Sequence, residues 1–158
     1  FEAVVAYGGV FSYTLDRRDE ALKECLRVLK PGGLLLLSVV SLWGSAHRHL
    51  DQVLKKPVEV NRRITDHGDI LPDLIPERGQ YMHMFRASEL RTWLEQAGLH
   101  ILVMSASDCL STGWNDTLES IRTDEEKWAE LLRMELEACA DPGSLNMGMH
   151  TIAVAHKP

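Results

Sequence analysis

The 158-residue sequence has little cysteine, no Cys-x-x-Cys pair and no long hydrophobic run. Its three cysteines, Cys25, Cys109 and Cys139, are far apart, so the sequence predicts neither a disulfide framework nor a zinc site. The longest apolar stretch, Leu34–Val40, is far shorter than the roughly 20 residues that a membrane span requires. These absences favour a protein of the reducing cytoplasm with no membrane segment.

The sequence also lacks an excess of basic residues. Seventeen Lys and Arg residues are outnumbered by 23 Asp and Glu residues, which gives a net charge of −6. Because binding to a phosphate backbone needs concentrated positive charge, this balance argues against a nucleic-acid partner. The length and the otherwise ordinary composition fit one globular domain or a part of one.

The first residues form an apolar segment and include no Met. Phe1-Glu2-Ala3-Val4-Val5-Ala6 has the continuous apolar character of a buried strand, whereas N-terminal segments are usually polar and mobile. The sequence therefore predicts a chain cut inside a fold, and we expect further residues of the same domain before Phe1.

Strand and helix patterns alternate along the chain. Continuous apolar segments predict buried strands, and apolar residues at spacings of three and four predict helices between them. The alternation predicts an α/β fold that opens with a right-handed βαβ unit. The polar ends of the last strand suggest an exposed margin of the sheet. We expect strands near residues 2–7, 34–40, 99–105 and 150–156, and helices near 16–29, 88–97 and 123–139.

Residues 41–80 show no regular pattern. A short helix is predicted over Trp43–Leu54, and the rest, interrupted by Pro and Gly, predicts a long irregular insertion. Such stretches in compact domains are commonly lids or binding loops, so residues 41–80 are expected to form a lid-like insertion. Asp66-His67-Gly68-Asp69 has the residue types of a metal site but not the spacing of a calcium loop, so no metal site is predicted.

Three motifs, in their order, resemble class I S-adenosylmethionine-dependent methyltransferases. Phe1-Glu2-Ala3-Val4 is similar to the Phe-Asp-x-Val opening of that family's fourth strand, with Glu2 in place of Asp. Leu29-Lys30-Pro31-Gly32-Gly33 is similar to the turn before its fifth strand, and residues 85–99 resemble the late helix that leads into its sixth. A nucleotide-dependent oxidoreductase of related topology is disfavoured by this turn and by the antiparallel last strand that the resemblance implies.

The resemblance also implies the arrangement of the strands. Residues 1–158 would be the C-terminal part of one methyltransferase domain, a partial Rossmann-like sheet with strand order 4-5-7-6. The last strand would be antiparallel, and helices would lie on both faces of the sheet. The family's glycine-rich loop and its acidic ribose-binding residue have no counterpart in the sequence. The chain alone is therefore expected to be inactive and to bind the cofactor weakly.

The cofactor implied by the resemblance is S-adenosylmethionine. Ala6, Tyr7, Gly8 and Gly9, at the carboxyl end of the first strand, are expected to face its methionine part. Ligands of open α/β sheets bind beyond the carboxyl ends of strands, and glycines let the backbone approach a ligand closely. The other interpretation of the two glycines is a tight turn.

Five residues are candidates for contact with a small-molecule methyl acceptor. Phe11 and Tyr13 follow the glycines, and Trp43 and His47 follow the second strand. His83 lies in an alternating segment, where it shares one face with Tyr81 and Phe85 while two methionines take the other face. The structural alternatives are a solvated helix for His47 and His49 and an ordinary lid strand for His83. No catalytic residue is predicted, because methyl transfer depends mainly on alignment and needs a base only if the acceptor must lose a proton.

Two functions are therefore open at this point. The first is methyl transfer from S-adenosylmethionine to a small molecule. The second is a methyltransferase-like module that binds a ligand or a protein without catalysis. An upstream strand followed by Gly-x-Gly-x-Gly and an acidic residue would favour the enzyme. In the isolated chain the first strand is also a raw sheet edge, which favours a homodimer formed through it.

Overall fold

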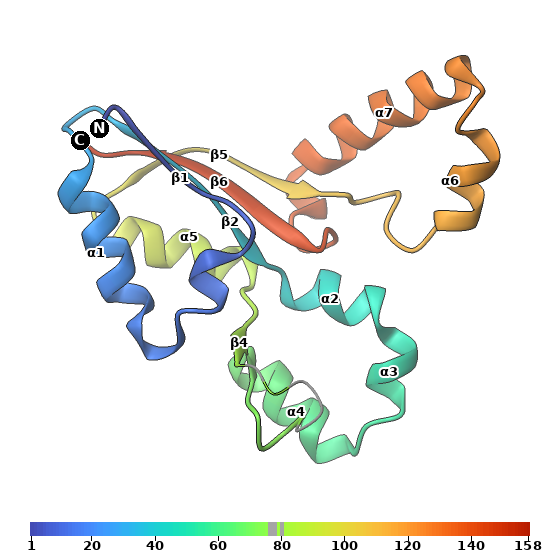
Figure 1. Ribbon diagram of the computed structural model, residues 1–158, viewed down its shortest axis with the longest axis horizontal. Coiled ribbons are helices and arrows are strands. Elements are labelled where there is room, and N and C mark those ends of the chain that lie inside the picture. The colour runs from blue at the N-terminus through green and yellow to red at the C-terminus, as the bar shows by residue number, and fades with distance from the viewer. Residues whose placement is uncertain (76–78, 80) are drawn as a thin grey trace.

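The computed structural model describes residues 1–75, 79 and 81–158. A four-stranded sheet in the order β1-β2-β6-β5 forms its centre (Figure 1). β1 (Ala3–Ala6) and β2 (Leu34–Val40) are parallel, and β6 (His150–His156) is antiparallel to both β2 and β5 (His100–Ser107). This order confirms the sheet that the resemblance implies. It also places β6 inside the sheet, so the exposed margin suggested by its polar ends is wrong.

Helices α1 (Arg18–Val28) and α5 (Ala87–Gln96) lie on the same side of this sheet (Figure 1). α1 connects β1 to β2 as a βαβ unit, and α5 leads into β5. Lys157, which directly follows β6, holds the C-terminal end of α1. Its ammonium donates to the carbonyls of Leu26 and Leu29 at 2.7 and 2.8 Å. These carbonyls have no partner within the helix, so the lysine satisfies acceptors that would otherwise need water.

The two faces of the sheet differ in how well they are covered. The cross-strand row Ala6–Leu37–Ala153–Met104 is buried throughout, under α1 and α5. The next row lies on the opposite face, and its outer members Val5 and Val103 are 62% and 50% exposed. A helix reaches this second face at one point, where the Ser105 hydroxyl donates to the carbonyl of Cys139 at 3.0 Å. Helices thus lie on both sides, but the main core is on one side only.

The segment after β2 is helical, contrary to the irregular insertion predicted there. It contains α2 (Leu42–Arg48), α3 (Leu50–Leu54), α4 (Val58–His67) and the two-stranded pair β3 (Asp69–Ile70) and β4 (Met82–His83). The helices have 7, 5 and 10 residues, which is too short for a clear apolar period in the sequence. The rest of the predicted insertion, Pro76, Glu77, Arg78 and Gln80, lies outside the described residues.

A second helical segment follows β5. α6 (Asn115–Ile121) and α7 (Glu125–Ala140) extend away from the sheet (Figure 1). α7 begins at Asp124, whose carboxylate accepts a hydrogen bond from the Lys127 N–H at 3.1 Å. Only the end of α7 is well buried, at Cys139, whereas Leu132 and Leu136 are 48% and 74% exposed.

Disulfides, metal-binding clusters and membrane-spanning helices are absent from the described part of the chain. Its three cysteines are free thiols. It contains no group of three or more His, Cys, Asp or Glu side chains placed to hold a metal ion. None of its helices is both long enough and apolar enough to cross a membrane.

Candidate functional site

The carboxyl ends of β1 and β2 are joined by two serine hydroxyls. After Ala6, the chain turns at Gly8 and Gly9 with φ angles of 78° and 75°, which favour glycine. The Gly8 N–H donates to Ser38 Oγ at 3.0 Å, and the Val40 N–H donates to Ser12 Oγ at 2.9 Å. β1 ends opposite Leu37, so Ser12 supplies the partner that a longer β1 would have given Val40. Sequence reasoning did not identify Ser38, and it considered Ser12 only as a pocket-lining residue beside Phe11 and Tyr13.

The two glycines of this turn have different surroundings. A Cβ placed on Gly8 would meet nothing within 4 Å, so the backbone there is open to a ligand. A Cβ on Gly9 would lie 3.2 Å from Val40 Cγ2, 3.4 Å from Tyr13 Cε2 and 3.8 Å from His150 Nε2. Of the predicted cofactor residues, Gly8 and Tyr7 are therefore exposed, while Ala6 and Gly9 are buried against β2 and its surroundings.

A cavity of about 280 Å³ lies beyond the carboxyl end of β2. This volume is close to the lower end of the range for small-molecule sites, roughly 300–1,000 Å³. Its walls come from α2, α3, α4, the β3–β4 pair and the start of β6. Ten of the eighteen described residues that line it are aliphatic or Met. Six of these ten residues form a buried apolar cluster: Val40, Leu42, Ile70, Ile75, Met82 and Met84.

One face of α2 forms a side of the cavity. Leu42, Ser45, Ala46 and His49 line it at spacings of three, four and seven residues, which place them on one helical face. The helix lies close to the turn before β6: a Cβ on Gly44 would lie only 1.7 Å from the Gly148 carbonyl oxygen. The short helix predicted over Trp43–Leu54 corresponds to α2 and α3, but the sequence analysis did not relate this spacing to a cavity.

β4 and the residues after it form the opposite wall. Met82 and Met84 line the cavity, whereas His83 and Phe85 pack together on the other side with their ring centroids 4.5 Å apart. The Phe85 N–H donates to the carbonyl of Val40 at 2.8 Å, which ties this wall to the end of β2. The predicted alternation is therefore confirmed, but the methionine face, not the histidine face, borders the cavity.

His83 is 4% exposed and lies between two carboxylates. Its Nδ1 is 2.7 Å from Asp69 Oδ1, and its Nε2 is 2.8 Å from Glu89 Oε1. Ionised carboxylates only accept hydrogen bonds, so a ring nitrogen donates to each ionised carboxylate that it meets. The His83 ring thereby joins β3 and β4 to α5. Arg18 lies beside this network, with its Nη1 3.9 Å from Glu89 Oε1.

The groups around His83 have perturbed pKa values. Tyr81 donates to Asp69 Oδ1 at 3.0 Å, and burial, followed by this hydrogen bond and the Asp69 charge, raises the pKa of Tyr81 to about 12. Burial raises the pKa of Glu89, but the hydrogen bond and charge of His83 outweigh it, so the pKa lies below its ordinary value. At neutral pH, Tyr81 is thus a neutral donor and Glu89 an ionised acceptor. The network therefore holds β3, β4 and α5 together through hydrogen bonds.

The five predicted acceptor residues lie in different places. Tyr13 lines the cavity. Phe11 is buried in the main core, edge-on to Trp93 at 5.3 Å between ring centroids. Trp43 is half-exposed beneath the Arg86 guanidinium, and His47 is exposed on α2. His83 is in the carboxylate network. The structure brings none of these four to the cavity within its described residues, and it places His49 there instead.

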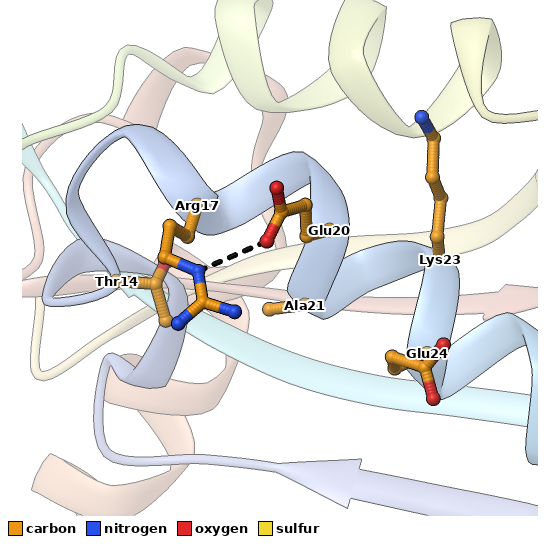
Figure 2. Close-up of a pocket in the computed structure, with 6 residues that line it drawn as sticks. All are labelled: Thr14, Arg17, Glu20, Ala21, Lys23 and Glu24. Carbon is orange, nitrogen blue, oxygen red and sulfur yellow. Dashed lines mark hydrogen bonds and ion pairs between the residues drawn. The ribbon is translucent and has the colours of Figure 1, made fainter.

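A second hollow, of about 650 Å³, runs along α1 (Figure 2). The described residues that line it all come from one short stretch, so no other element faces them across the hollow. Arg17 and Glu20 form an ion pair at 2.9 Å there, with both side chains exposed. The hollow is a groove between solvated side chains, and its described residues do not enclose a binding site. Its lining residues are Thr14, Arg17, Glu20, Ala21, Lys23 and Glu24.

Comparison with known proteins supports the resemblance seen in the sequence. Residues 1–37 match a family model described as a methyltransferase domain. A solved structure of an S-adenosylmethionine-dependent methyltransferase from Mesorhizobium loti is similar, with a TM-score of 0.55 and 15% identity over 99% of this chain and 62% of that one. The chain has the fold of class I S-adenosylmethionine-dependent methyltransferases. In terms of this methyltransferase fold, β1, β2, β6 and β5 stand in the order 4-5-7-6 that the resemblance implies.

Another structure with this methyltransferase fold has a different name. The [4+2]-cyclase SpnF is similar with a TM-score of 0.50 and 22% identity, over 100% of this chain and 51% of that one. The chain thus spans 62% and 51% of the lengths of these two proteins. A comparison with curated proteins finds no match.

Proposed function

We propose that this chain is part of an enzyme that transfers a methyl group from S-adenosylmethionine to a small-molecule acceptor. The observation that carries the proposal is the shared wall between the glycine turn and the cavity. Val40, Tyr13 and His150 line the cavity, and all three lie within 4 Å of a Cβ placed on Gly9. A cofactor at the turn and an acceptor in the cavity would therefore be neighbours.

The residues of the turn fit one side of the cofactor. The open backbone at Gly8 leaves room for a ligand, and the position beyond the carboxyl end of β1 is typical of ligand sites in open α/β sheets. S-adenosylmethionine supplies a methyl group on a positively charged sulfur. Ala6, Tyr7, Gly8 and Gly9 would bind and orient it, while the cavity would exclude water and align the acceptor. Such alignment accounts for most of the catalysis that this reaction needs.

We further propose that the 158 residues alone bind S-adenosylmethionine weakly and are inactive. The sequence offers no glycine-rich loop after a strand and no acidic residue beyond it to hold the ribose. The chain would provide one wall of the cofactor site and most of the acceptor side.

A pair of glycine variants tests the cofactor site in the product of the complete reading frame. Gly8→Ala and Gly32→Ala both place a methyl group at a φ above 70°, and neither Cβ meets another atom within 4 Å. The two variants therefore share the same backbone strain, but only Gly8 lies at the proposed site. We expect Gly8→Ala to weaken S-adenosylmethionine binding more than tenfold in calorimetry and Gly32→Ala to change it less than twofold. Equal effects would contradict the placement of the cofactor.

One observation supports a second function. A protein named as a [4+2]-cyclase shares the fold, so the fold alone does not fix methyl transfer. The alternative is a module that binds a ligand or a protein in this framework without transferring a methyl group. Incubation of the complete protein with methyl-labelled S-adenosylmethionine and a panel of neutral acceptors distinguishes the two. Labelled product supports the enzyme, whereas cofactor or ligand binding without any labelled product supports the module.

The edge strand supports a proposal about self-association. β1 is at the sheet edge, with Val5 exposed, so its free backbone groups can pair with β1 of a second copy. We propose such a homodimer for the isolated chain. We also propose that the protein is cytoplasmic and has no nucleic-acid partner. Sedimentation over a range of concentrations tests it: Val5→Lys should shift the chain to monomer, while Val58→Lys, on exposed α4, should not.

A further inference from the structure

The chemistry of the cavity narrows the class of acceptor. We infer that the cavity takes an uncharged, mostly apolar small molecule with one hydrogen-bonding group, and that Ser45 holds that group. This inference deepens the proposed function, since it rests on the cavity being the acceptor site of the same enzyme.

The wall chemistry favours an apolar body for the ligand. Ten of the eighteen described lining residues are aliphatic or methionine, including residues of β2, α2, α4 and β4, and the methionines can adjust to ligands of different shape. Apolar ligand surface is driven against such a wall by removal from water. A strongly polar molecule would lose its hydration without gaining partners along this apolar part of the wall.

Ser45 provides the hydrogen-bonding partner. It lines the cavity, is 8% exposed, and its Oγ has no hydrogen-bond partner among the described residues. Buried hydroxyls are normally satisfied, so a hydroxyl left unpaired beside an apolar cavity points to a partner supplied by a ligand. Rotation about χ1 moves the hydroxyl between staggered positions, and it can donate or accept once turned to the cavity. The ligand group can therefore be a hydroxyl, a carbonyl or an uncharged amine.

The charges around the cavity disfavour an ionic ligand. No Asp or Glu occurs among the described lining residues, so a cationic amine would find no carboxylate there. The one Lys of the lining, Lys56, already has an interaction partner, as does His49. An anion would have to displace these partners, whereas a neutral molecule would not.

The methionines allow a site-resolved test on the 158-residue chain itself. With ¹³C-methyl methionine, Met82, Met84 and Met149 report from the cavity wall, and Met104 and Met134 report from outside it. The probes are 1-naphthol, naphthalene, 1-naphthoate and 1-naphthylmethylammonium, which share one apolar body and differ in the attached group. We expect 1-naphthol to shift the three cavity methyls and to bind most tightly, with both ions at least tenfold weaker.

Two matched pairs of variants assign the binding. Ser45→Ala should weaken 1-naphthol about five- to tenfold, to the level of naphthalene, and leave naphthalene unchanged; Ser120→Ala, on exposed α6, should alter neither. Ala46→Phe should fill the cavity and abolish binding, while Ala129→Phe, on exposed α7, should not. The inference is overturned if an ion binds tightest, if Met104 or Met134 shifts instead, or if Ser45→Ala affects both neutral probes equally.

The test separates this inference from the proposed function, because it contains no S-adenosylmethionine. If the probes bind as expected but the complete protein transfers no methyl group, the cavity chemistry stands and the enzyme proposal falls. If the complete protein methylates only charged acceptors, the enzyme proposal stands and the inference about the acceptor class falls.

Discussion

The segments that follow β2 and β5 start at the same end of the sheet, where the carboxyl ends of both strands lie, yet they fold in different ways. Both contain short helices with apolar residues. The segment after β2 returns to its starting point, where Ser41 pairs with Phe85 and Phe85 bonds to Val40. The segment after β5 extends outward (Figure 1). Apolar residues of α7 such as Leu136 remain exposed.

This difference shows what makes a cavity in this molecule. Helix content is similar in the two segments, but among the described residues the first closes around six buried apolar residues. The second buries a smaller cluster of Ala106, Cys109 and Cys139. The closure depends on contacts between residues far apart in the sequence, such as Gly44 against Gly148 and His83 against Asp69. Substitutions at these contacts should therefore be costly, whereas substitutions on α7 should not.

Gly44→Ala should have the largest effect. The new Cβ would lie 1.7 Å from the Gly148 carbonyl oxygen. Because the neighbour is a backbone atom, no side-chain rotation relieves this contact. We expect α2 to be displaced and the free energy of unfolding to fall by about 3 kcal/mol. Denaturant unfolding measures this change, and the Met149 methyl signal should shift in the folded variant.

Gly143→Ala is the control for this substitution. Its Cβ would lie 3.0 Å from Asp141 Oδ1, at the end of a flexible side chain, so the contact can relax. If Gly44→Ala is no more destabilising than Gly143→Ala, the close approach of α2 to the turn before β6 is wrong.

His83→Ala should have the second-largest effect. It removes a ring that two carboxylates share and leaves Asp69 and Glu89 without this hydrogen-bond partner. We expect a loss of about 2–3 kcal/mol in the free energy of unfolding, while His47→Ala, on an exposed helix face, should cost less than about 0.5 kcal/mol. Binding of 1-naphthol should change less than twofold in the folded fraction, because the His83 side chain is not among the described lining residues.

A double-mutant cycle shows whether charge causes this loss. In an Asp69→Asn background one of the two carboxylates is absent, so His83→Ala should cost clearly less than in the wild-type chain. An equal cost in both backgrounds would mean that His83 acts through packing against Phe85 alone.

The sheet could be predicted from the sequence, and the closure of the first helical segment could not. Continuous apolar runs and the Lys30-Pro31-Gly32-Gly33 turn are local signals, so β1, α1 and β2 follow from neighbouring residues. The segment after β2 depends instead on distant groups. Ser41 Oγ donates to the Asn146 carbonyl at 3.2 Å, and the Asn146 side chain accepts from the Ala87 N–H at 2.9 Å. No local pattern announces such contacts.

The same distinction applies to the candidate site. The positions of the glycine turn and of Tyr13 beyond the first strand could be predicted, because both directly follow a recognisable strand. The role of His83 could not, because it depends on the pairing of β3 with β4, which brings Asp69 to it from 14 residues away. The sequence did separate the two faces of residues 81–85, but only the fold decides which face meets the cavity.

The acid sensitivity of the first segment should depend on Glu89. Its pKa is lowered in the folded chain from an ordinary value of 4.5, so the unfolded chain binds the proton more readily. The stabilising contribution is therefore complete above pH 4.5 and is lost as the pH falls through the folded-state pKa. Glu89→Gln should flatten the fall in melting temperature between pH 6 and pH 3, compared with the exposed control Glu59→Gln. Parallel curves would exclude the contribution of Glu89.

Leu136→Lys should have the smallest effect, and it tests the other half of the comparison. The side chain is 74% exposed on α7, so a charged residue there loses little buried apolar area. We expect a change below about 0.5 kcal/mol in the free energy of unfolding, against a loss of about 2–4 kcal/mol for Leu42→Ala in the buried cluster after β2. A large loss for Leu136→Lys would show that the α7 face is covered in solution, and it should then depend on protein concentration if a second copy covers it. A small and concentration-independent change means that the Leu136 face of α7 is not covered in solution.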